Sequence, residues 1–173
     1  MGDRAAAHPA GAERGGGDAG ADVRVSLHGG LGWAEAEFRA AFQAKLAAAE
    51  PLAQHLGPYD RADVMGLMRA VDWVVVPSTW WENAPLVIHE ARAAGRPVIC
   101  SGIGGMAELV EAGVNGLHVP PGDVAALAET MQLAAADADR WDRMARAVAP
   151  ASHAAFVEAH LGLYQALRDR VAA

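Results

Sequence analysis

The hydrophobic pattern of the chain changes at residue 23. From there, segments with the two-residue period of a strand alternate with segments that have the 3.6-residue period of a helix. Residues 23–28 alternate as a strand does, and the spacing over 33–50 is typical of a helix. The run 73–77 is short, apolar and rich in valine, which predicts a central parallel strand covered on both faces. Further strands are expected at 52–56, 97–100 and 117–119.

Helix signals separate these strands. Asp60 and Asp123 are placed to cap helices at their first turns. Asn83 and Pro85 place a cap and a first-turn proline at another helix start, and Gly95 ends that helix. Strand and helix therefore alternate along the chain, which indicates an α/β fold with a Rossmann-like open parallel sheet flanked by helices.

The two ends of the chain differ from its middle. Residues 1–22 contain six Gly and seven Ala without apolar periodicity, so we expect a disordered leader there and one folded domain over 23–173. Two closing helices are expected at 139–149 and 152–171. The second has an apolar stripe for which packing against the domain is the default. The stripe consists of Phe156, Leu163, Tyr164, Leu167 and Val171.

Composition narrows the class of protein. The 173 residues are 53% hydrophobic, which fits one soluble globular domain. The net charge is -7, and an acidic surface repels phosphate backbones, so nucleic acid is not expected as a partner. The single cysteine, Cys100, excludes an intramolecular disulfide. No uncharged stretch approaches the roughly 20 residues of a membrane span. We expect a cytoplasmic location, with peripheral attachment to the inner face of the membrane left open.

Candidate chemistry gathers after the strand 73–77. Ligands of an open parallel sheet bind at the carboxyl ends of its strands, and the loop there leads to two carboxylates, Glu82 and Glu90. Between them lie the N–H groups of Ala84, Leu86 and Val87, at a helix start whose positive end suits a phosphate. Carboxylates accept hydrogen bonds from sugar or ribose hydroxyls. A nucleotide sugar carries phosphates, a ribose and a second sugar, and so offers a group to each of these sites.

The motifs around this loop run in a characteristic order. They are Asp72-Trp-Val-Val-Val-Pro-Ser78, Trp81-Glu82, Pro85-Leu86, Glu90-Ala91, Gly95-Arg-Pro-Val-Ile99, Gly104-Gly105 through Glu108, and Asn115-Gly116. Together they resemble the donor half of glycosyltransferase family 4, whose members are retaining enzymes of the GT-B fold. The resemblance implies a domain equivalent to the C-terminal half of such an enzyme, which moves a hexosyl unit from a nucleotide diphosphate sugar to an acceptor hydroxyl.

The resemblance also implies roles for residues. In the family's Glu-x7-Glu motif, the first Glu contacts the transferred sugar and the second contacts the ribose. The resemblance therefore implies Glu82 as the catalytic residue on the sugar and Glu90 as the residue on the ribose. The base would lie near Gly57 and Tyr59, and the diphosphate at the helix start. No metal and no cofactor besides the donor substrate are implied. The expected donor-binding residues are Gly57, Tyr59, Ser78, Glu82, Asn83, Ala84, Pro85, Leu86, Val87, Glu90, Gly104 and Gly105.

Some of these positions also have structural interpretations. Trp80 and Trp81 follow a core strand, where paired aromatic residues are expected to pack against the neighbouring helix; stacking on a base or sugar is the alternative. The pair Gly104-Gly105 fits the steric needs of a tight turn that opens a helix. Ser78 fits a local backbone cap better than a nucleophile. The seven histidines have no metal-binding spacing.

Two departures leave alternatives open. The family's Gly-Arg…Lys-Gly segment would precede residue 23, where Arg4 and Arg14 are the basic residues, and the one lysine, Lys45, falls inside a predicted helix. An acceptor-binding N-terminal domain does not fit this length. Transfer would then require a separate acceptor domain or chain, and a catalytically inactive remnant that binds nucleotide sugars is the alternative. A nicotinamide-dependent oxidoreductase, suggested by Gly30-Leu-Gly32, is disfavoured because Glu35 stands at its third glycine position.

Overall fold

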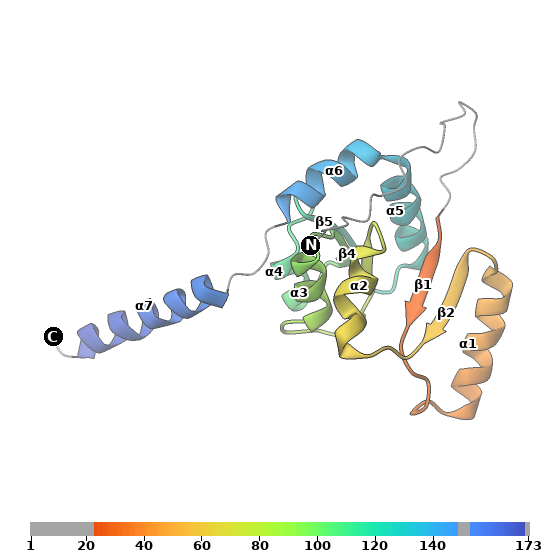
Figure 1. The fold of residues 1–173 in the computed structure, drawn as a ribbon, viewed down its shortest axis with the longest axis horizontal. Helices are drawn as coiled ribbons and strands as arrows, with labels where there is room; N and C mark the ends of the chain where they lie inside the picture. Colours follow the sequence, from red (N-terminus) through yellow and green to blue (C-terminus); the bar gives the residue numbers. More distant parts are fainter. Residues whose placement is uncertain (1–22, 149–152, 172–173) are drawn as a thin grey trace, which may run out of the picture.

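The computed structural model describes residues 23–148 and 153–171, and strands alternate with helices along them (Figure 1). The strands are β1 (Val25–His28), β2 (Ala53–Gly57), β3 (Val74–Val76), β4 (Val98–Ser101) and β5 (Gly116–Val119). The helices are α1 (Ala36–Ala49), α2 (Val64–Arg69), α3 (Leu86–Ala93), α4 (Gly104–Leu109), α5 (Val124–Ala136), α6 (Ala138–Ala147) and α7 (His153–Val171), with a 3₁₀ turn, η1 (Arg61–Asp63), before α2. The expected leader, residues 1–22, lies outside the described residues.

The strands pair in parallel, as predicted, and form two sheets. One sheet contains β1 and β2, and the other has the order β3-β4-β5. The expectation that the valine-rich run 73–77 is a central strand is wrong within this second sheet, because β4 lies in its middle and β3 at its edge. A continuous apolar run shows that a strand is buried, and it carries no information about which neighbours the strand pairs with.

The core lies on both faces of the three-stranded sheet. All four residues of β4 are buried, and their side chains alternate between the faces. On one face, Val98 and Cys100 pack with residues of α3 and α4; on the other, Ile99 packs with residues of β5 and α5. The buried partners on the two faces are Ile88, Ala91, Met106 and Val110, and Val119 and Ala134, respectively. Because β4 is fixed in this way, so is the turn that follows its carboxyl end.

Helix α6 is attached to the beginning of β3 by polar contacts. The indole N–H of Trp141 donates a 2.7 Å hydrogen bond to the carbonyl oxygen of Asp72. The guanidinium of Arg96 lies 5.6 Å from the centre of the Trp141 ring and donates to the carbonyl oxygen of Arg69. These contacts join α6, the end of α2 and the segment before β4 at the amino ends of β3 and β4.

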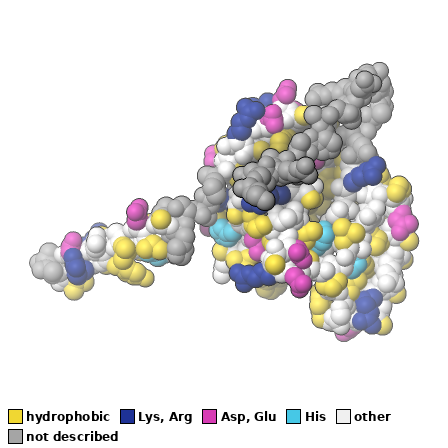
Figure 2. Space-filling model, in the orientation of Figure 1, with side chains coloured by type: hydrophobic (Ala, Val, Ile, Leu, Met, Phe, Trp, Pro, Cys, Tyr) yellow, Lys and Arg dark blue, Asp and Glu magenta, His cyan; other side chains and the backbone are white. Residues whose placement is uncertain are grey.

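Two parts of the described chain bury little of their apolar surface. No residue of α1 is buried. Helix α7 lies apart from the other elements, and hydrophobic side chains gather along it (Figures 1 and 2). The expected packing of this helix is wrong for its described side chains, because its large apolar residues are 40–89% exposed. These residues are Val157, Leu161, Leu163, Tyr164, Leu167 and Val171. The side chain of Phe156 lies outside the described residues.

Candidate functional site

The loop after β3 is held in shape by its own backbone. The N–H of Trp80 donates a 3.2 Å hydrogen bond to the hydroxyl of Ser78, and the N–H of Glu82 donates a 3.0 Å bond to the carbonyl oxygen of Trp80. The interpretation of Ser78 as a local backbone cap is thereby confirmed, while its contact with a ligand stays a prediction. The two bonds fix the position from which the half-buried side chain of Glu82 projects.

The start of α4 packs directly against this loop. The N–H of Gly105 donates a 2.6 Å hydrogen bond to the carbonyl oxygen of Glu82. A Cβ atom at Gly105 would overlap the carbonyl group of Asn83, and one at Gly104 would lie 2.9 Å from the oxygen of Glu82. Gly104 also has a φ of +52°, which side chains rarely adopt. The steric requirement expected for the Gly104-Gly105 pair is therefore confirmed, and the pair lies beside Glu82 and Asn83.

Helix α3 begins later than predicted. Its first residue is Leu86, Pro85 occupies the N-cap position, and no side chain caps the helix. The expectation that Asn83 is the cap is therefore wrong, because Asn83 lies two residues before the position at which a side chain can reach the first turn. The N–H groups of Leu86 and Val87 belong to this uncapped first turn, where backbone donors have no intrahelical partner. Glu90 lies one turn further on and is half-buried.

A groove runs between η1 and α2 on one side and α3 on the other. Its volume is about 640 Å³. We call it the α3 groove, and its lining residues are Tyr59, Arg61, Val64, Met65, Leu86, His89, Glu90 and Ala93. Three predicted site residues, Tyr59, Leu86 and Glu90, are thus brought together although Tyr59 and Glu90 are far apart in the sequence. Glu82 is not among the lining residues, so the two carboxylates of the spacing motif occupy different surroundings.

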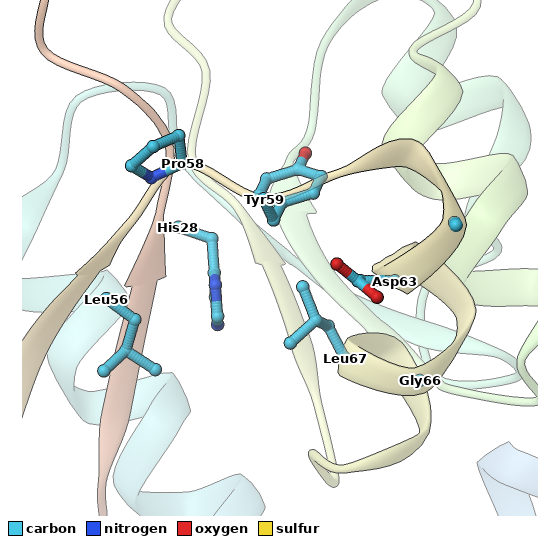
Figure 3. Close-up of a pocket in the computed structure, with 8 residues that line it drawn as sticks. His28, Leu56, Pro58, Tyr59, Asp63, Gly66 and Leu67 are labelled. Carbon is cyan, nitrogen blue, oxygen red and sulfur yellow. The ribbon is translucent and has the colours of Figure 1, made fainter.

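A second hollow lies on the other side of Tyr59 (Figure 3). Its volume is about 550 Å³. We call it the His28 pocket, and its lining residues are His28, Leu56, Pro58, Tyr59, Ala62, Asp63, Gly66 and Leu67. Figure 3 shows the side chains of His28 and Leu56 facing those of Asp63 and Leu67 across it. The His28 ring meets the Tyr59 ring edge to face at 5.9 Å, so Tyr59 forms the wall between the two hollows.

Gly57 shapes the turn that places Tyr59. It ends β2 with a φ of +77°, and its carbonyl oxygen accepts a 2.9 Å hydrogen bond from the N–H of Gly29. A residue with a side chain would be strained at this φ. The structure therefore assigns Gly57 a role in the backbone path, and its contact with a base stays a prediction.

The two tryptophans before Glu82 do not pack as expected. Trp80 is 75% exposed and Trp81 is 72% exposed. The prediction that they cover the neighbouring helix is therefore wrong for most of their surface, because the loop between β3 and α3 is held by the backbone contacts described above; only an edge of the Trp81 ring lies beside Gly104 at the start of α4. Two adjacent aromatic residues after a core strand in the sequence do not indicate the geometry of the loop that carries them.

Sequence reasoning missed other residues of the two hollows. Arg61, His89 and Asp63 line them without having been predicted as site residues. The signal for Arg61 was available, since it lies two positions after the predicted base-binding Tyr59. For Asp63 the signal was absent, since its position depends on the 3₁₀ turn η1, which the helical pattern did not distinguish from α2.

Neither a cluster of potential metal ligands nor a helix that could span a membrane occurs in the described part of the chain. There, no three or more His, Cys, Asp or Glu residues are grouped so that they could hold a metal ion. No helix among residues 23–148 and 153–171 combines the length and the apolar character needed to cross a bilayer.

The parallel strands flanked by helices, with the site at the carboxyl ends of the strands, assign the chain to the class of Rossmann-like α/β domains. Within that class, the sequence matches the family of glycosyl transferases group 1 over residues 14–137, and the chain belongs to that family. Glycogen synthase of Mycobacterium tuberculosis is 38% identical over 92 residues, which are 53% of this chain and 22% of that protein. A D-inositol 3-phosphate glycosyltransferase of a Mycobacterium species is 37% identical over 113 residues, 64% of this chain and 25% of that protein. The chain therefore spans about a quarter of the length of these curated relatives.

Solved structures with the same arrangement confirm the predicted fold class. Anabaena Alr3699/HepE in complex with UDP has a TM-score of 0.64 and 33% identity over 73% of this chain and 35% of that one. Its complex with UDP-glucose has a TM-score of 0.65 and 31% identity over 71% and 34%. Sucrose-phosphate synthase of Thermosynechococcus elongatus has a TM-score of 0.68 and 28% identity over 84% and 38%. The predicted resemblance to glycosyltransferases is confirmed.

Proposed function

We propose that this chain is the donor-binding part of a retaining glycosyltransferase and that it binds a nucleoside diphosphate sugar. One observation carries the proposal: Tyr59, Leu86 and Glu90, the positions expected near the base, the phosphates and the ribose, line a single groove. The similar structures that hold UDP or UDP-glucose support the same ligand class.

The diphosphate would lie at the start of α3. The free N–H groups of Leu86 and Val87 and the positive end of the helix attract an anion. Preorganised donors at this place would also stabilise the negative charge that develops on the departing diphosphate. The ribose hydroxyls would donate hydrogen bonds to the carboxylate of Glu90, one turn along the same helix.

Glu82 would hold the sugar that is transferred. Its backbone is held by the hydrogen bond from Gly105, so the point from which its side chain projects is set before the sugar binds, which lowers the entropic cost of orientation. In the retaining reaction, the bond from the sugar to the diphosphate breaks and a bond to the acceptor oxygen forms on the same face. The leaving phosphate takes the acceptor proton, so no Asp or Glu nucleophile is required.

The acceptor would be bound by a separate domain or chain. The second candidate function is a catalytically inactive subunit that binds the nucleotide sugar. It is favoured by the position of the one lysine, Lys45, which lies within α1 and outside both hollows. The two candidates share the donor site and differ in turnover, which release of nucleotide from a UDP-sugar in the presence of acceptor would measure.

Calorimetric titration of the 173-residue chain with UDP-glucose, a GDP-sugar and NAD tests the proposal. We expect a nucleotide sugar to bind and NAD not to bind. Replacing Glu90 by Gln should weaken nucleotide-sugar binding by about 1–3 kcal/mol, because a hydrogen-bonded charged acceptor is lost. Glu129→Gln, at an exposed position of α5, removes the same charge and should leave the affinity unchanged. Equal affinities of the parent and Glu90→Gln would remove Glu90 from the donor site.

A further inference from the structure

Arg61 faces Glu90 across the α3 groove. Arg61 is the first residue of η1, on the wall formed with α2, whereas Glu90 belongs to α3 on the opposite wall. Among the lining residues of this groove, Arg61 is the one Lys or Arg and Glu90 is the one carboxylate. Arg61 takes part in none of the salt bridges found between described residues, such as those of Arg140, Arg146 and Arg168. Its exposed guanidinium is therefore available to a ligand in the groove.

The order of groups along the groove indicates which part of a nucleotide Arg61 would meet. This step depends on the proposed function. With the diphosphate at Leu86 and the ribose at Glu90, the base extends towards Tyr59 and Arg61. A phosphate placed beside Glu90 would instead be repelled by its carboxylate. Arg61 therefore lies at the base end of the nucleotide rather than at its phosphate end.

The chemistry of a guanidinium then selects among bases. Arginine presents N–H donors in a fixed fork and has no acceptor. Uracil and guanine offer carbonyl oxygens, and guanine adds the neighbouring N7 acceptor. Adenine places an amino donor beside its N7, which suits an amide side chain and opposes a guanidinium. We infer that Arg61 is a specificity-determining residue that favours a carbonyl-bearing base, uracil or guanine, over adenine.

Titrations of the 173-residue chain with UDP, GDP and ADP test this inference. We expect the parent to bind UDP or GDP at least about tenfold more tightly than ADP, and Arg61→Gln to lose most of that preference by weakening the favoured nucleotide. The comparison of UDP with GDP identifies which carbonyl-bearing base is preferred. Arg61→Lys keeps the charge without the fork, so it should recover little of the preference. Arg143→Gln, at an exposed position of α6, removes an equal charge away from the groove and should change none of the affinities.

Each other outcome overturns the inference in a recognisable way. If Arg61→Gln weakens UDP, GDP and ADP equally, the residue contacts the phosphates that all three share. If it weakens none of them, Arg61 does not contact the nucleotide, and the donor site of the proposed function stands. If the folded parent binds no nucleotide, the proposed function fails and the inference fails with it. Far-ultraviolet circular dichroism and thermal unfolding of each variant establish that the fold is intact in every comparison.

Discussion

The backbone N–H of Gly105 is 2.6 Å from the carbonyl oxygen of Glu82, and the two segments touch so closely that a side chain at Gly105 has no room. A Cβ atom there would overlap the carbonyl group of Asn83. The first turn of α4 thus supports the loop that carries Glu82. The glycine at 105 is required by this contact between backbones, whereas Gly104 is required by its positive φ as well.

Replacing Gly105 by Ala should therefore move the loop that carries Glu82. We expect the free energy of unfolding to fall by about 1–3 kcal/mol, because a methyl group is forced into a filled site. Nucleotide-sugar affinity should fall as well, because Glu82 is displaced. Urea unfolding and calorimetric titration measure the two effects.

Gly66→Ala provides the matched control. Gly66 lies inside α2, and an added Cβ would meet no atom within 4 Å. Because alanine is favoured over glycine in a helix, this variant should be more stable by about 0.5–1 kcal/mol. A Gly105→Ala protein as stable as the parent would show that the two segments separate without cost.

A second prediction concerns the buried thiol of Cys100. Burial raises the pKa of this thiol from 9.0 to about 11. Since the pKa is higher in the folded chain, the unfolded chain loses the proton first as the pH rises. The contribution of the thiol to stability is therefore complete below about pH 9 and is lost progressively towards about pH 11.

Unfolding of the parent and of Cys100→Ala at neutral and alkaline pH measures this effect. The parent should lose more stability than the variant as the pH rises from about 9 to about 11. All other ionisable groups are common to both proteins, so the difference isolates the thiol. Rapid modification of native Cys100 by a thiol reagent at neutral pH would contradict its burial.

Helix capping gives a third prediction with an internal control. The carboxylate of Asp123 accepts a 2.9 Å hydrogen bond from the N–H of Ala126 at the start of α5, whereas Asp60 makes no such bond at η1. Asp123→Ala should lower the free energy of unfolding by about 1 kcal/mol. Asp60→Ala should change it by less than about 0.5 kcal/mol, as is usual for surface substitutions. Chemical denaturation compares the two variants, and equal losses would assign the effect to charge alone.

These aspartates also show how far the sequence predicts the structure. The pattern placed both at helix starts, and the cap of α5 is confirmed, but the capping role of Asp60 is wrong because a 3₁₀ turn precedes α2. Local pattern predicts the type and order of elements, since periodicity reports which face is buried. It does not predict the geometry of short connections, which depends on contacts between distant segments, such as that of Gly105 with Glu82.

In the candidate site, too, local features could be predicted from the sequence and contacts between distant segments could not. The positions of Glu82 and Glu90 relative to the strand and helix could be predicted, because both lie within one strand–loop–helix unit. The groove that joins Glu90 to Tyr59 and Arg61 depends on the packing of α2 against α3, which no local pattern describes. For this reason Arg61 was not predicted, although it lies two residues from a predicted position.

The exposed tryptophans give the fourth prediction. Trp80 and Trp81 are largely exposed, whereas Trp73 is half-buried and packs against the core on the face of Ile99, Val119 and Ala134. Trp80→Phe and Trp81→Phe should each reduce the fluorescence that acrylamide quenches and should change stability by less than about 0.5 kcal/mol. Trp73→Phe should leave the quenchable emission unchanged and so raise the quenched fraction of the remaining fluorescence. It should also lower stability, because the smaller ring leaves a gap against the core. If the emission lost in Trp80→Phe or Trp81→Phe is the part shielded from acrylamide, the rings pack against the protein, as the sequence pattern first predicted.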